Sequence, residues 1–231
     1  MGVISLEKSE CMFWMGRYVE RVYTTLSIFN DVLDRMLDQN TQRYVGFCER
    51  LNIPNIYSSP EDFVDRYLFD PENPDSVISN LGRAYDNAMV LRNEIGSLTL
   101  SYIQLALDHM KESRGTDSQF LNNQDIMDYL LAFWGSMDDL VEGWERRNLV
   151  KCGKYIERLD LYCRLDISQR QVAREFSKLQ PRMERLNLPI RAERYERLKA
   201  LIDDKENWDK NRMEALDCVD HLFLPAGSSA V

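Results

Sequence analysis

The stretch Gly16-Arg17-Tyr18-Val19-Glu20-Arg21 returns later in the chain as Gly153-Lys154-Tyr155-Ile156-Glu157-Arg158. Each copy lies in a segment whose apolar residues recur at spacings of three and four, which is typical of a helix with one buried face. A glycine inside a helix costs about 1 kcal/mol relative to alanine, yet both copies carry one ahead of a Glu-Arg pair. We therefore expect a duplicated helical element in which Gly16 and Gly153 allow another backbone to approach closely.

The composition is that of an ordinary globular protein. Of the 231 residues, 44% are hydrophobic and 29% are charged, and the 10 glycines and 7 prolines are too few for a many-stranded β fold. The net charge of -9 argues against nonspecific binding of nucleic acid. The sequence contains no apolar run of transmembrane length, and its first residues lead us to expect no signal peptide. We expect a soluble, cytoplasmic protein without membrane association.

Hydrophobic periodicity predicts an all-α chain, a multi-helix bundle with an internal helical duplication. Ser59 is expected to cap a helix that begins at Pro60, and Asn73 to cap one whose first residue is Pro74. Pro181 and Pro189 should divide the charged region after residue 168 into shorter helices. The expected helices span 10–37, 41–51, a segment from 60, 74–111 (as one helix or as two joined by a kink near Gly96), 123–142, 144–166 and 191–221.

We expect three parts along the chain. A helical core with both hexapeptide copies spans 1–167, charged helices that pack on this core span 168–224, and residues 225–231 form a disordered tail.

The two Glu-Arg pairs are the candidate charged centre. If the helices pack as pseudo-symmetric partners, Glu20 meets Arg158 and Arg21 meets Glu157. Such crossed ion pairs could simply fix the register between duplicated helices. Alternatively, the same side chains line a cavity and bind a carboxylate, an amine or a phosphate, because the planar fork of arginine suits anionic groups. A third interpretation is that these side chains are simply exposed to solvent, and the sequence leaves all three open.

Other kinds of site find little support. His109 and His221 lie far apart in sequence and no Glu-x-x-His motif is present, so we expect no metal site. Phosphate-binding glycine motifs and nucleophile-elbow motifs are also missing. We therefore expect no cofactor. The five cysteines form no CxxC and are interpreted as reduced thiols.

Three segments together resemble the bacterial alpha-E family. Residues 13–21 are similar to its opening, in which a tryptophan precedes Gly-Arg-Tyr-x-Glu-Arg. Residues 70–77, continuing to Asn87-Ala88 and Arg92, look like its central segment of Asp-x-x-Asn-Pro-x-Ser followed by Asn-Ala and arginine. Trp144 with residues 153–158 is similar to its second copy. The similarity spans about residues 10–166, beyond which the chain departs from the family pattern, as it also does at Gly96-Ser97-Leu98.

The resemblance implies a helical fold and a class of partner. Alpha-E proteins often accompany circularly permuted ATP-grasp proteins, a group thought to make or modify peptide-type amide bonds. We therefore expect an accessory or substrate-binding protein that acts with an ATP-grasp-type amide (peptide) ligase and binds the ligase, a peptide or amino-acid substrate, or both. The expected contact residues, beside Gly16 and Gly153 at close helix contacts, are Arg17, Tyr18, Glu20, Arg21, Arg92, Tyr155, Glu157 and Arg158.

Two alternatives remain. The chain could be an enzyme in its own right that uses a buried Glu20 or Glu157 as general base. It could also be a structural protein that self-associates as a homo-oligomer, for example through Trp14 or Trp134.

Overall fold

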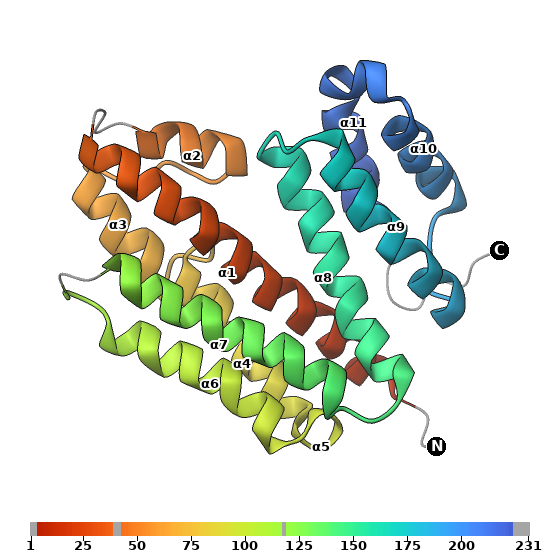
Figure 1. The fold of residues 1–231 in the computed structure, drawn as a ribbon, viewed down its shortest axis with the longest axis horizontal. Coiled ribbons are helices and arrows are strands. Elements are labelled where there is room, and N and C mark those ends of the chain that lie inside the picture. Colours follow the sequence, from red (N-terminus) through yellow and green to blue (C-terminus); the bar gives the residue numbers. More distant parts are fainter. Residues whose placement is uncertain (1–3, 39–42, 117–118, 224–231) are drawn as a thin grey trace. The chain divides into compact units, whose positions relative to one another are not determined.

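The computed structural model describes residues 4–38, 43–116 and 119–223, and these form α-helices joined by short connections (Figure 1). The all-α prediction is confirmed. The chain divides into two compact units, Met1–Gly153 and Lys154–Val231, and the division falls within helix α8 (Trp144–Arg164). The boundaries that we placed at residues 167 and 224, and the internal duplication, stay predictions. The expected disordered tail, 225–231, lies outside the described residues.

The first unit is built from α1 and six further helices, together with the first part of α8. Helix α1 packs along α4 and α7, and α6 packs against the same two helices. Met15, Val19 and Val22 on α1 are fully buried, as the three-and-four spacing predicts. These helices are α1 (Leu6–Asp38), α2 (Arg43–Leu51), α3 (Pro60–Phe69), α4 (Val77–Val90), α5 (Arg92–Ile95), α6 (Ser97–Glu112) and α7 (Gln119–Asp139).

An aromatic cluster joins α1 to α2 and α3 at one end of the first unit. The Phe63 ring stacks on Tyr67 with centroids 5.3 Å apart and lies 5.6 Å from Phe29 of α1. Phe47 of α2 meets the same group edge-on, 5.7 Å from Phe63. Such pairs contribute about 0.5–1.5 kcal/mol each beyond the burial of their area. The short helices α2 and α3 are thereby tied to the long helix α1.

The second unit contains the last part of α8 and the C-terminal helices. Helix α10 packs against α11, and Ile190 forms an antiparallel bridge with Phe223. Buried side chains of α9 follow the helical period, namely Val172, Phe176, Leu179 and Met183. The elements are α9 (Gln169–Leu186), α10 (Ala192–Asp203), the 3-10 helix η1 (Lys205–Asn207) and α11 (Trp208–Asp220).

Several boundaries differ from the prediction. Helix α4 begins at Val77 with Ser76 as its cap, so the assignment of Asn73 and Pro74 to its start was wrong. Pro181 lies inside α9 and does not divide it. The ring is exposed to solvent, and the buried apolar face of α9 outweighs the lost backbone hydrogen bond. The helix expected over 191–221 is interrupted between Asp203 and Trp208.

Of the two possibilities for residues 74–111, one helix or two joined near Gly96, the structure shows a break at Gly96. Its φ of 80° and ψ of 154° are incompatible with a helix and separate α5 from α6. Glycine is the residue that adopts a positive φ without steric cost. A second break, at Leu91 between α4 and α5, could not be predicted because no glycine or proline marks it.

Candidate functional site

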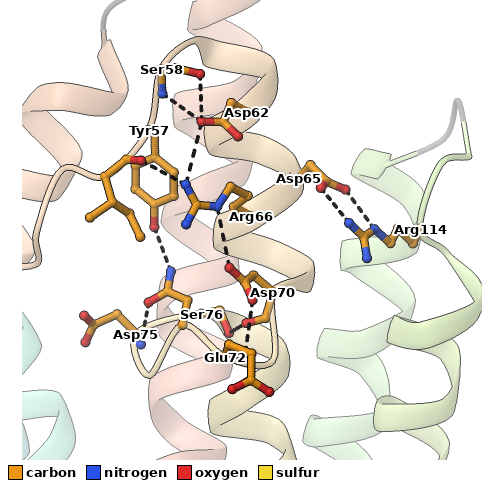
Figure 2. A network of polar contacts seen from close by, with 12 residues as sticks. Tyr57, Ser58, Asp62, Asp65, Arg66, Asp70, Glu72, Asp75, Ser76 and Arg114 are labelled. Carbon is orange, nitrogen blue, oxygen red and sulfur yellow. Dashed lines mark hydrogen bonds and ion pairs between the residues drawn. The ribbon is translucent and has the colours of Figure 1, made fainter.

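The central segment, residues 70–76, forms the turn between α3 and α4 (Figure 2). One carboxylate oxygen of Asp70 accepts the N–H of Glu72 at 3.0 Å. The Ser76 hydroxyl donates to the Asp70 carbonyl at 2.6 Å and accepts the N–H of Ser79 at 3.2 Å, which caps α4. These aspartate and serine side chains of the segment therefore fix the direction in which α4 leaves the turn.

Asn73 holds the middle of this turn. Its Oδ1 accepts the N–H of Asp75 at 3.0 Å, and its Nδ2 donates to the Tyr57 hydroxyl at 3.1 Å. Burial raises the pKa of Tyr57 to about 12, so this phenol is neutral at physiological pH. Arg66 of α3 donates to the Ile56 carbonyl at 2.9 Å and joins the same network. Asn73 thus stabilises the turn rather than the helix start that we predicted.

The turn also positions Arg83 of α4. Its Nη1 donates to the Pro74 carbonyl at 3.1 Å. From there the guanidinium lies 5.9 Å from the centroid of the Tyr18 ring on α1, within cation–π distance. The central segment and the first hexapeptide, which lie far apart in sequence, are therefore in contact through Arg83.

A groove of about 340 Å³ lies between α1 and α4 beside this contact. We call it the α1–α4 groove. Trp14, 40% exposed, stacks on Tyr18 with ring centroids 5.6 Å apart. The guanidinium of Arg17 lies 5.0 Å from the centroid of the Trp14 ring. The residues that line the groove are Glu7, Glu10, Cys11, Trp14, Tyr18, Arg83, Asp86 and Asn87.

The groove is acidic. Glu7, Glu10 and Asp86 are exposed to solvent, and within the part of the chain that the structure describes they form no ion pair. Burial, followed by the charges of Glu7 and Glu10, raises the pKa of the Cys11 thiol above its ordinary value. Cys11 is therefore a thiol rather than a reactive thiolate at neutral pH. Three carboxylates beside a stacked aromatic pair suit an amine or a guanidinium.

The other residues of the first hexapeptide are buried or half-buried. Glu20 is fully buried, and its Oε1 accepts a hydrogen bond from Thr24 at 3.2 Å. Gly16 is buried on the same helix and Arg21 is half-buried. Glu20 lies outside the lining of the α1–α4 groove. In the first copy, Glu20 is thus buried, whereas Tyr18 lines the α1–α4 groove.

The glycine of the second copy is in close contact with α1. A Cβ atom added at Gly153 would lie 2.0 Å from the carbonyl oxygen of Phe13 and 3.0 Å from the backbone nitrogen of Arg17. Real Cβ atoms do not come within 3.0 Å of such atoms. Only glycine therefore fits this position without a shift of the backbone. For Gly16, close helix contact stays a prediction.

The remainder of the second copy belongs to a charged cluster on α8 and α9, which we call the α8–α9 cluster: Tyr155, Arg158, Glu175, Lys178 and Arg182. Glu175 accepts hydrogen bonds from Arg158 at 3.0 Å and from Lys178 at 2.7 Å. The Tyr155 ring has the Lys178 ammonium 5.6 Å and the Arg182 guanidinium 5.0 Å from its centroid. Burial alone would raise the pKa of Glu175, but the bonds from Lys178 and Arg158 outweigh it and lower this pKa.

The expected contact residues are distributed over both units of the chain. Tyr18 lines the α1–α4 groove, with Arg17 over Trp14 beside it. Tyr155 and Arg158 belong to the α8–α9 cluster, and Glu157 is fully buried on α8. Arg92 is exposed on α5, donates to the Ser97 hydroxyl at 3.3 Å, and lies in neither site. The crossed pairing of Glu20 with Arg158 and of Arg21 with Glu157 stays a prediction.

Sequence reasoning missed the acids of the groove and the cations of α9. Glu7, Glu10 and Asp86 give no sequence signal, because only the packing of α1 on α4 brings them together. Lys178 and Arg182 could have been found, since they follow Arg174 at spacings of four and so share one helix face. In the described residues no group of three or more His, Cys, Asp and Glu side chains is placed to hold a metal ion. None of the helices described is long and apolar enough to cross a bilayer.

These observations define an all-α protein with a charged site in each of its two units, and each site includes residues of one Glu-Arg hexapeptide. The chain belongs to the Alpha-E family, whose model, described as a predicted alpha-helical domain with a conserved ER motif, matches residues 8–199. Both hexapeptide copies and the turn at 70–76 lie within the matched range. Searches of curated proteins and of solved structures gave no match to the chain.

Proposed function

We propose that this Alpha-E protein is an accessory protein of an ATP-grasp-type amide (peptide) ligase, and that it holds an amine or guanidinium group in the α1–α4 groove. The group belongs to a basic side chain of the ligase or to its peptide or amino-acid substrate. The observation that carries the proposal is the groove itself. Residues of the opening and central family segments meet there, around three carboxylates that form no ion pair in the described part of the chain.

The chemistry of the groove supports a cationic occupant. A volume of about 340 Å³ is at the small end of ligand pockets and accommodates a side chain or an amino acid rather than a nucleotide. The stacked rings of Trp14 and Tyr18 offer an apolar wall, and Glu10 and Asp86 offer carboxylate acceptors. The sequence has no nucleotide-binding motif, and an ATP-grasp partner would supply that part of the reaction.

The proposal is tested by recovering the protein from its native host. The wild-type chain should bring down an ATP-grasp-type ligase in stoichiometric amount, identified by mass spectrometry. Asp86→Lys, which places a cation in the groove, should reduce the recovered ligase at least tenfold if the ligase supplies the basic group. The matched control is Glu112→Lys, a charge reversal at an exposed position of α6 outside the groove.

A second measurement covers the case in which the substrate supplies the amine. Calorimetric titration with a lysine-containing dipeptide should give saturable binding to the wild type and to Glu112→Lys, and about tenfold weaker binding to Asp86→Lys. The proposal is overturned if no ATP-grasp-type ligase is recovered with the wild-type chain and the dipeptide also does not bind to it.

The burial of Glu20 and Glu157 favours a second candidate, an enzyme that uses a buried carboxylate as general base. This candidate predicts turnover of a peptide or amide substrate by the purified chain alone, and loss of that turnover in Glu20→Gln or Glu157→Gln.

The exposed Trp14 leaves self-association as a third candidate. Light scattering across a concentration series, with Trp14→Ala beside the wild type, would detect a dimer that depends on this side chain.

A further inference from the structure

The cations of α9 form a stripe along one face of the helix. Arg174, Lys178 and Arg182 are spaced by four residues, so their side chains follow one another on successive turns. Like charges at this spacing repel and destabilise a helix. An anion beside the stripe therefore stabilises the helix.

The described protein groups neutralise this stripe only in part. Glu175 is the one carboxylate in the α8–α9 cluster, and Arg158, Lys178 and Arg174 of the stripe already share it. Arg182 has no acidic partner among the described residues, and its Nε has no acceptor there either. Its Nη1 donates to the backbone carbonyl of Lys178. Within the described residues, Arg182 is thus the cation of the stripe that has no carboxylate partner.

The cluster is also half removed from water. The side chains of Arg158 and Lys178 are 19% and 30% exposed, and that of Glu175 is 5% exposed. Charges in such places are screened less than on an open surface, so an unneutralised cation is costly there. The partial exposure still lets a small ligand reach the ammonium group. Both cations also lie against the nearly buried ring of Tyr155, which supports their positions.

The charge of the second unit does not oppose an anion. Residues 154–231 carry 15 Lys and Arg against 14 Asp and Glu, a formal charge of +1, whereas residues 1–153 carry 14 against 24, a formal charge of -10. The chain as a whole has a charge of -9. A small anion is therefore less repelled by the second unit than by the first.

We infer that the α8–α9 cluster binds an oxyanion, a carboxylate or a phosphate group, through Lys178 and Arg182 with Tyr155 as the supporting ring. Arg182 presents a planar fork of donors that matches either anion, and Lys178 adds a point charge. In the ligand-free protein, Glu175 takes the place of this anion on Lys178. The inference does not rest on the proposed function, because it concerns other residues and its test measures binding to the purified chain alone.

The test is thermal denaturation of the full chain at constant ionic strength. One series replaces chloride by inorganic phosphate. Another adds an acetylated alanine dipeptide with a free carboxylate, or the same dipeptide as its amide. A ligand that binds the folded state raises Tm as its concentration exceeds Kd. The wild type should be stabilised by phosphate or by the free carboxylate but not by the amide.

Substitutions of the cations and of Glu175 should change anion affinity in opposite directions. Lys178→Gln and Arg182→Gln should each weaken the apparent affinity about tenfold, as expected for loss of one charge-assisted contact. Glu175→Gln removes the competing carboxylate and should strengthen anion binding several-fold, even if the variant is less stable without ligand. Lys199→Gln, an exposed lysine of α10 outside the cluster, is the matched control and should bind like the wild type.

Each outcome has a defined meaning. Stabilisation by phosphate alone identifies a phosphate group as the ligand, and stabilisation by the free dipeptide alone identifies a peptide carboxylate. Stabilisation by both supports a general oxyanion site. No stabilisation by either, or equal stabilisation of the wild type and of Lys178→Gln and Arg182→Gln, overturns the inference. Unchanged or weaker anion binding in Glu175→Gln would also overturn it.

Discussion

At Gly153 the backbone of α8 comes so close to that of α1 that a single methyl group decides whether the helices can meet. The Cβ of an alanine would lie 2.0 Å from the Phe13 carbonyl oxygen, which is backbone and cannot rotate away. We predict that Gly153→Ala destabilises the protein by about 3 kcal/mol, because overpacking against backbone forces the helix to move. Urea denaturation followed by circular dichroism measures this change.

Gly135 provides the matched control for this substitution. It lies inside α7, and nothing comes within 4 Å of a Cβ added there. Alanine has the better helix propensity, so Gly135→Ala should stabilise the protein by up to about 1 kcal/mol. Equal midpoints for Gly153→Ala and the wild type would contradict the prediction.

The glycine and glutamate patterns could be read from the sequence, but their surroundings could not. A glycine within a helix indicates a close backbone contact, and an amphipathic pattern indicates a buried face. Gly153 and Glu20 could therefore be selected as candidate residues from the sequence alone. The acids Glu7, Glu10 and Asp86 carry no such signal, because most exposed carboxylates belong to solvated faces. Only the packing of α1 against α4 makes them lining residues of one groove.

At the scale of the helix, the start of α4 depends on one buried hydroxyl. Ser76 is fully buried, caps Ser79 and donates to the Asp70 carbonyl. Ser76→Ala therefore removes the cap and leaves a backbone carbonyl without its donor. We predict a loss of about 2 kcal/mol in the free energy of unfolding. Thermal or urea denaturation would test this value.

Ser168 allows the same substitution at a cap position without a cap hydrogen bond. It precedes α9, but its side chain accepts no hydrogen bond from the first turn of that helix. Ser168→Ala should therefore change stability by less than about 0.5 kcal/mol. If Ser76→Ala were equally mild, the turn at 70–76 would not depend on its serine.

Helix boundaries were harder to predict than the helices themselves. Asn73 and Ser76 both have side chains that cap helices, and sequence alone could not rank them. In the structure, Asn73 donates a hydrogen bond to Tyr57, which is distant in sequence, and Ser76 caps α4. Pro181 shows the converse, since a local breaker is tolerated where buried residues on both sides, such as Leu179 and Met183, anchor the helix.

At the scale of the whole molecule, the acidic charge is concentrated in one unit. The formal charge of -10 in residues 1–153 includes the acids of the α1–α4 groove, whereas residues 154–231 are close to neutral. A field of this kind attracts a basic ligand before any contact is made and raises its association rate. The contacts within the groove then determine how long the ligand stays. The electrostatic field of the first unit should therefore change the association rate constant, and the contacts within the α1–α4 groove should change the dissociation rate constant.

This separation predicts the salt dependence of binding to the groove. For a short lysine peptide, raising NaCl from about 50 to about 500 mM should lower the association rate constant about tenfold and change the dissociation rate constant much less. Stopped-flow measurement of tryptophan fluorescence can follow both rate constants, because Trp14 lines the groove. Trp14→Phe should abolish the signal and so identifies its source. An association rate that does not respond to salt would mean that the acidic charge of the first unit plays no part in capturing the ligand.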